Sequence, residues 1–124
     1  MIFVTADSSR TQLERLTRLL VSAFPGSTIY QHSDLFRVPH DVLNNKVDAV
    51  FLEAETEKTG GLDLMQRLHR QKPELSVFII STTDDLREKA VEAGANGYFV
   101  LPAGEEQFLN AIPEAKTRRA YRDD

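Results

Sequence analysis

Short runs of apolar residues recur along the chain at regular intervals. Five runs, rich in Val, Ile and Phe, lie at residues 2–4, 28–30, 49–52, 77–80 and 98–100. They are unbroken rather than alternating with polar residues, and Pro, Gly, Ser and Asp flank them. This pattern is typical of parallel strands that are covered on both faces. We therefore predict five buried strands.

Helical patterns lie between the predicted strands. The clearest places four apolar residues on one stripe, Leu13, Leu16, Leu20 and Ala23. Three candidate N-cap residues precede this stripe, Asp7, Ser8 and Ser9, and Pro25-Gly26 follows it. A second stripe contains Leu62, Met65 and Leu68, and a third contains Leu86, Ala90 and Ala93. Each stripe predicts a helix with one face against the core.

Two further helices have weaker patterns. Pro39 interrupts the segment at residues 35–45, so this helix is expected to be short and to begin near His40. A fifth helix is indicated by Phe108, Leu109 and Ile112. Pro113 should end or kink it.

Five strands, each followed by a helical pattern, predict one α/β domain. Its sheet should be parallel and doubly wound, with helices on both faces. We assign the domain to residues 1–112 and expect a polar tail or the start of a linker at 113–124. Functional residues should lie at the carboxyl ends of the strands, at positions 5–7, 53, 81–83 and 101.

Composition excludes several classes of function. The net charge of −4 disfavours nucleic-acid binding by this segment alone. Without cysteine the chain has no disulfide or thiolate metal site, which fits a reducing compartment. The N-terminus is not a signal peptide, and no apolar run approaches the roughly 20 residues of a membrane span. We expect a cytoplasmic protein with no membrane contact.

Three sequence segments together resemble the receiver domain of bacterial response regulators, the CheY-like family, over residues 1–112. They are DAVFLEAE, with Gly61 eight residues after Glu53, then VFIIS and AGANGYFVLP. The resemblance implies a flavodoxin-like (βα)5 fold. It also implies ancestry in two-component systems, in which a histidine kinase phosphorylates an aspartate at the end of the third strand. The short interval between the fourth and fifth strands is similar to receivers that precede LytTR-type DNA-binding domains.

In active receivers two acidic residues after the first strand hold magnesium, a hydroxyl follows the fourth strand, and a lysine precedes a proline after the fifth. When the resemblance is applied to this sequence, the phosphate acceptor corresponds to Glu53 and the acidic pair to Thr5 and Ala6. The hydroxyl corresponds to Ser81 and the lysine to Leu101. Thr5 and Ala6 lack the carboxylates that magnesium requires. Leu101 cannot neutralise a transferring phosphoryl group. We therefore expect no phosphoryl chemistry, no metal, no cofactor and no enzyme activity.

Glu53 and Asp7 have two interpretations each. Glu53 is either a solvated strand-end residue or a partial imitation of phosphoaspartate, with one charge in place of about −1.5 to −2. Asp7 is interpreted as an N-cap in preference to a metal ligand beside Glu53. Tyr98 falls on the aromatic switch position of the family. The histidines lack ligand spacing and are expected at the surface, at positions 32, 40 and 69.

The leading functional hypothesis is a phosphorylation-independent pseudo-receiver. It would bind a protein partner, or a second copy of itself, through the face at residues 85–112, for example as the regulatory part of a transcription regulator. One alternative is an atypical phosphoacceptor that uses Ser81, Thr82 or an acidic side chain. Another is a small-ligand domain that uses the pocket at the strand ends.

Overall fold

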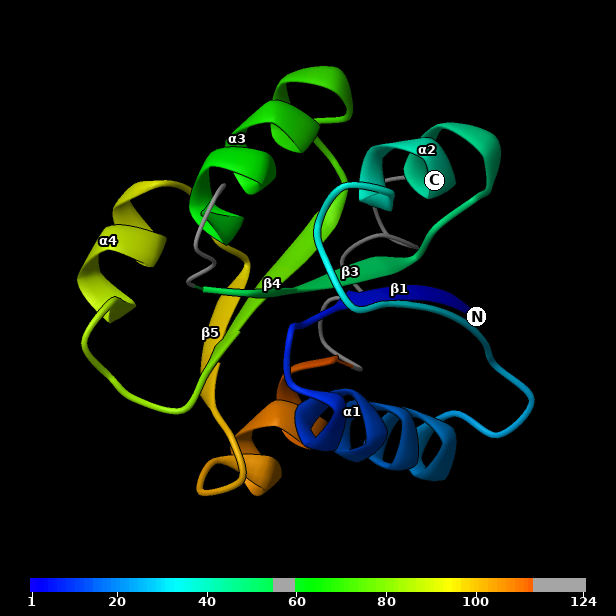
Figure 1. Ribbon diagram of the computed structural model, residues 1–124, viewed down its shortest axis with the longest axis vertical. Coiled ribbons are helices and arrows are strands. Elements are labelled where there is room, and N and C mark those ends of the chain that lie inside the picture. Colours follow the sequence, from blue (N-terminus) through cyan, green and yellow to red (C-terminus); the bar gives the residue numbers. More distant parts are fainter. Residues whose placement is uncertain (55–59, 113–124) are drawn as a thin grey trace.

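The computed structural model describes residues 1–54 and 60–112, and in this part of the chain five parallel strands form one sheet (Figure 1). Their spatial order is β2-β1-β3-β4-β5. The chain therefore winds outward from β1 in both directions, which confirms the predicted doubly wound sheet. The strands are β1 (Ile2–Ala6), β2 (Thr28–His32), β3 (Ala49–Glu53), β4 (Ser76–Ser81) and β5 (Gly97–Val100).

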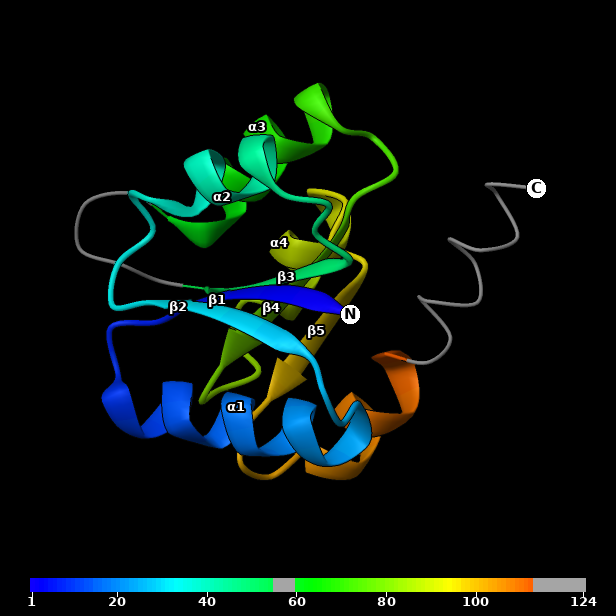
Figure 2. The same cartoon turned by 90° about the vertical axis from the view of Figure 1, so that its right-hand side faces the viewer.

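Helices cover both faces of this sheet, as predicted (Figure 2). One face carries α1 (Arg10–Ala23) and the helical residues 105–112. The other face carries α2 (Val38–Asn44), α3 (Gly61–Gln71) and α4 (Arg87–Glu92). The fifth helix is thus confirmed to residue 112. The predicted effect of Pro113 and the predicted tail at residues 113–124 lie outside the described residues.

The two faces bury different kinds of side chain. Under α1 and residues 105–112, phenylalanine rings form a layer in which Phe51 stacks on Phe78 with ring centroids 5.3 Å apart. In the same layer Phe99 meets Phe108 edge-on, also at 5.3 Å. The opposite core is mainly aliphatic and includes Val4, Val50, Leu52, Met65 and Ile79. Because successive strand residues point to opposite faces, two apolar cores require the unbroken apolar runs of the sequence.

Helix α1 departs from its predicted pattern at one position. Its three predicted core leucines are buried, which confirms that part of the stripe. Ala23 is exposed, so the stripe is wrong there. Phe24, the residue after the helix, contacts the core instead, with its ring 5.6 Å from that of Phe3.

Helix α2 begins at Val38, earlier than the predicted start near His40. The prediction treated Pro39 as an interruption, but Pro39 lies in the first turn of the helix. Proline is tolerated there because the first backbone N–H groups of a helix have no intrahelical partner. Val38 is consequently a buried anchor of α2.

Leu16→Ala tests the core under α1. Leu16 is 1% exposed, so the substitution should lower the free energy of unfolding by about 2–5 kcal/mol, through lost burial and the cavity that remains. Urea unfolding followed by circular dichroism measures this. Val21→Ala on the same helix is the control, because Val21 is 44% exposed and its truncation should cost well under about 1 kcal/mol. Equal losses in both variants would contradict the core assignment.

Candidate functional site

The carboxyl ends of β1, β3 and β4 meet at one edge of the sheet. In the register of the strands, Ala6 lies beside Leu52 and Glu53 lies beside Ile80. The β1–α1 loop, which begins with Asp7, is therefore next to the end of β3. Parallel pairing thus brings the predicted strand-end positions together.

The carboxylate of Glu53 is held by a single serine. Oε2 of Glu53 accepts a hydrogen bond from the backbone N–H of Ser8 at 2.9 Å. Oε1 accepts a hydrogen bond from the hydroxyl of Ser8 at 2.7 Å. We call this pair of contacts the Ser8–Glu53 clasp; it ties the β1–α1 loop to the end of β3. Ser8 is predicted from the sequence only as a candidate helix cap, and no sequence pattern points to this second role.

Gly61, the first residue of α3, lies directly against the backbone of Glu53. A Cβ atom on Gly61 would lie 2.0 Å from the carbonyl oxygen of Glu53. Only glycine permits this approach without movement of the backbone. The Gly61 that contributes to the family resemblance therefore positions α3 on the acceptor strand.

Asp7 is almost completely buried beside this carboxylate, with 4% of its surface exposed. Its Oδ1 accepts a hydrogen bond from the backbone N–H of Ser9 at 2.8 Å, and its own N–H donates to the carbonyl of His32 at 3.1 Å. Burial raises the pKa of Asp7 to about 6; the Ser9 hydrogen bond opposes this shift and the charge of Glu53 adds to it.

The expected N-cap role of Asp7 is wrong. The cap of α1 is Ser9, whose side chain accepts a hydrogen bond from the backbone N–H of Gln12 at 3.2 Å. Asp7 lies two residues before the cap and supports it by accepting from Ser9 itself. Its carboxyl group lies close enough to Glu53 for the charge of Glu53 to act on it.

Thr5 and Ala6 bring no charged group to the pocket, and both are fully buried. Ala6 belongs to the aliphatic core. The hydroxyl of Thr5 has no hydrogen-bond partner within residues 1–54 and 60–112.

Leu101 is also fully buried and belongs to the phenylalanine-rich core. Only its backbone takes part in polar contacts. Its N–H donates to the carbonyl of Ser81 at 2.9 Å, and its carbonyl accepts from the side chain of Gln12 at 3.4 Å. The peptide bond to Pro102 is cis. The position that corresponds to the lysine of active receivers is thus occupied by a core residue.

Ser81 and Tyr98 are joined through the β4–α4 loop. Oγ of Ser81 accepts from the backbone N–H of Thr83 at 3.1 Å, and the hydroxyl of Tyr98 donates to the carbonyl of Thr83 at 2.7 Å. Tyr98 is 5% exposed. The guanidinium of Arg87 lies 5.0 Å from the ring centroid of Tyr98 and donates to its carbonyl at 3.1 Å. The switch-position aromatic is therefore held inward by contacts from two sides.

The histidine prediction is wrong for two of the three residues. His40 is exposed, as expected. His32 and His69 are partly buried. The ring of His69 lies within hydrogen-bond distance of the Leu75 carbonyl, at 3.0 Å, and of Asn96 Oδ1, at 3.2 Å. These two polar partners provide hydrogen-bond contacts for the His69 ring, which explains why a histidine predicted at the surface is partly buried.

Comparison with known families agrees with this fold. The model of the response regulator receiver domain matches residues 2–113, and the chain belongs to that family. It is therefore the receiver domain of a response regulator, a signalling module of two-component systems. Receiver domains are in general non-enzymatic and interact with kinases and other proteins.

Individual relatives are distant. The chain is 27% identical over 123 residues to the response regulator MprA of Mycobacterium sp. (strain KMS), which covers 98% of this chain and 52% of that protein. It is 28% identical over 78 residues to the response regulator GacA of Pseudomonas aeruginosa, covering 61% of this chain and 36% of GacA. The chain thus spans about half the length, or less, of these curated relatives.

Solved structures support the same fold. The signal receiver domain of an HD domain-containing protein from Pseudomonas fluorescens Pf-5 superposes with a TM-score of 0.85 at 25% identity, covering 98% of this chain and 90% of that one. A receiver domain protein from Clostridium thermocellum gives a TM-score of 0.82 at 22% identity, with 97% of each chain covered.

No helix in the described part of the chain is long and apolar enough to cross a membrane.

The acidic pair that holds magnesium in active receivers is absent at Thr5 and Ala6, which leaves Asp7 and Glu53 as the carboxylates at the strand ends. Magnesium requires near-octahedral oxygen ligands, usually with one or two free carboxylates. Here both oxygens of Glu53 accept hydrogen bonds from Ser8, and burial raises the pKa of Asp7 to about 6, so this carboxyl group takes up a proton at a higher pH than an exposed one does. No group of three or more His, Cys, Asp or Glu side chains could hold a metal within the described residues.

Asp7→Asn tests the buried carboxyl group. The pKa of Asp7 rises from 3.8 to about 6 on folding, so the folded protein binds this proton more tightly than the unfolded chain does. The resulting stabilisation is complete below about pH 4 and is lost as the pH rises through about 6, by at most roughly 3 kcal/mol. Across this window the free energy of unfolding of the wild type should fall relative to that of Asp7→Asn, measured by urea titrations.

Asp34→Asn is the matched control for this measurement. Oδ1 of Asp34 also accepts a backbone N–H two residues ahead, from Phe36 at 2.9 Å, but Asp34 is exposed. The control should therefore follow the wild type. Parallel pH curves for the wild type and Asp7→Asn would show that Asp7 is not desolvated as described.

Proposed function

We propose that this receiver domain signals without phosphorylation, because its pocket carries a built-in negative charge where other receivers acquire a phosphoryl group. The observation that carries this proposal is the Ser8–Glu53 clasp. The clasp fixes a carboxylate at the acceptor position and connects it to the loop after β1. Both contacts are exposed to solvent, and both orient the carboxylate toward the β1–α1 loop.

The chemistry of phosphoryl transfer supports the same proposal. Catalysis of that transfer depends on cations that neutralise charge on the phosphoryl oxygens and hold the reacting atoms in line. Leu101 supplies no cation and lies in the core, while Thr5 and Ala6 supply no carboxylate to hold one. The carboxylate of Glu53 is also displaced by one methylene from the position that an aspartate would take.

The contacts of Tyr98 are consistent with a single signalling state. A receiver that switches needs two packings of similar free energy, and a charge in the pocket selects between them. In this domain the inward position of Tyr98 is supported by Thr83 and Arg87. A permanent charge on Glu53 would hold this packing, so we infer that the surface next to it is constitutively formed.

We place the working surface on α4, β5 and the helix at residues 105–112. Tyr98 is part of β5, and Arg87 connects it to α4. Val91 on α4 is 64% exposed, which leaves an apolar side chain free to contact a protein partner or a second copy of the domain. Because the matched relatives are about twice as long, we propose that the domain regulates an effector, as in transcription regulators.

The domain should not take up phosphate from acetyl phosphate in the presence of magnesium. Intact-mass spectrometry measures this, because one phosphoryl group adds a discrete mass. The expected result is an unchanged mass under conditions that phosphorylate an active receiver. A magnesium-dependent adduct on Glu53 would contradict the proposal, and one on Ser81 or Thr82 would favour an atypical acceptor.

Single and combined substitutions extend this test. Glu53→Asp alone should still not be phosphorylated, because the cation-binding groups remain absent. Glu53→Asp combined with acidic residues at positions 5 and 6 and with Leu101→Lys is the variant in which uptake is expected to return. Recovery in Glu53→Asp alone would mean that the pocket retains a functional metal site.

Glu53→Gln tests whether the fixed charge sets the working surface. Glutamine carries no charge and keeps one acceptor oxygen for Ser8, while an NH2 donor replaces the second oxygen. If the charge holds the packing of Tyr98, affinity for a partner, or self-association, should fall by roughly 5- to 150-fold, and Tyr98→Ala should weaken it similarly. Glu53→Asp retains the charge and is the control. Affinity or self-association is measured by calorimetry or sedimentation. An unchanged value in folded Glu53→Gln would mean that Glu53 is only a solvated strand-end residue.

A further inference from the structure

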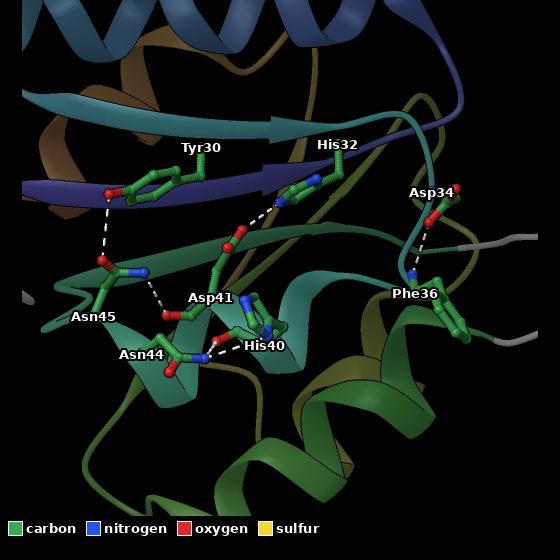
Figure 3. A network of polar contacts seen from close by, with 8 residues as sticks. All are labelled: Tyr30, His32, Asp34, Phe36, His40, Asp41, Asn44 and Asn45. Carbon is green, nitrogen blue, oxygen red and sulfur yellow. Dashed lines mark hydrogen bonds and ion pairs between the residues drawn. The ribbon is translucent and has the colours of Figure 1, made fainter.

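A shielded imidazole–carboxylate pair joins β2 to α2 (Figure 3). Strand β2 is at the opposite end of the sheet from β5, and α2 lies away from α4 (Figure 1). Nε2 of His32, the last residue of β2, is hydrogen-bonded to Oδ2 of Asp41 in α2. Their side chains are only 19% and 13% exposed. The two residues come from consecutive elements, so the contact fixes where the helix lies after the chain leaves the strand.

Shielding makes this pair different from other ion pairs of the domain. The side chains of Arg10 and Glu14, for example, are 92% and 68% exposed. Exposed pairs of that kind are screened by solvent and salt and contribute little. The His32–Asp41 contact is screened less, and it is an ion pair only while the imidazole is protonated. An imidazole ordinarily changes charge between about pH 5 and 8.

Helix α2 has few other anchors. It has seven residues, of which Val38 and Val42 are buried, and its N-cap makes no side-chain hydrogen bond. A helix of this length has little intrinsic stability and depends on its tertiary contacts. At its C-terminal end Tyr30 donates to Asn45 at 3.3 Å, and Lys72 donates to the carbonyl of Val42 at 2.8 Å.

The titratable groups around His32 determine the sign of the effect. Asp41 faces it from α2, and Asp7 lies on the β1 side, where its N–H donates to the His32 carbonyl. Asp34 and Arg37 lie on the exposed loop that leads into α2. The nearest partner is thus a carboxylate, so protonation of His32 strengthens the contact and deprotonation weakens it.

We propose that His32 and Asp41 form a proton-dependent latch that fixes α2 on the sheet and that loosens as the pH rises. The latch would control the surface that carries Leu43, which is 64% exposed, and the preceding loop residue Phe36, which is 89% exposed. This surface is separate from the one assigned to α4 and β5. The proposal therefore adds a second, pH-dependent response to the domain and does not depend on the charge of Glu53.

Amide hydrogen exchange of α2, measured by NMR on the full chain, tests the latch. After correction for intrinsic exchange rates, protection of the α2 amides in the wild type should fall about three- to tenfold between about pH 5.5 and 8, relative to the amides of β3. His32→Gln and Asp41→Asn should have low protection at both pH values. Asp41→Asn retains a hydrogen-bonding side chain at position 41, so it is the variant to measure if His32→Gln does not fold.

His40→Gln is the matched control, because His40 is on the same helix, is exposed, and contacts Asn44. It should keep the pH dependence of the wild type, and so should Glu53→Gln. Equal protection of α2 at both pH values in the wild type would overturn the latch. A pH dependence that persists in Asp41→Asn would overturn it as well.

Discussion

Parallel pairing of β1 with β3 is the constraint on which the rest of this domain depends. It places β1 inside the sheet, so both faces need a helical cover and both cores are apolar. It also aligns Ala6 with Leu52, which brings the loop after β1 to the end of β3. The Ser8–Glu53 clasp and the burial of Asp7 both follow from that alignment. The pocket is therefore a product of the sheet register.

Two positions at which the family resemblance implies charged residues carry apolar side chains that belong to the core. Leu101 extends the phenylalanine-rich layer, and Ala6 extends the aliphatic one. Apolar residues at these two positions avoid the cost of burying charge near the strand ends. The two carboxyl groups at the strand ends have different environments. Glu53 accepts two hydrogen bonds, whereas burial raises the pKa of Asp7 to about 6.

The sequence was sufficient to predict the strands and the edge of the sheet at which the site lies. Unbroken apolar runs identify strands that are covered on both faces, and parallel strands end at a common edge. The clasp could not be predicted, because it joins residues 45 positions apart and depends on register. The start of α2 was misplaced because Pro39 is compatible with a first turn as well as with a break. Partners of His32 likewise depend on where α2 lies.

The most direct test of the built-in charge is an NMR titration with magnesium and the phosphomimetic beryllofluoride. In a receiver that depends on phosphorylation, these ligands bind at the acceptor and shift the amides around it. If Glu53 already supplies the signalling charge, the amides of Ser8, Thr83 and Tyr98 should not shift, and the spectrum should remain that of the free domain. Saturable shifts at these amides would contradict the account.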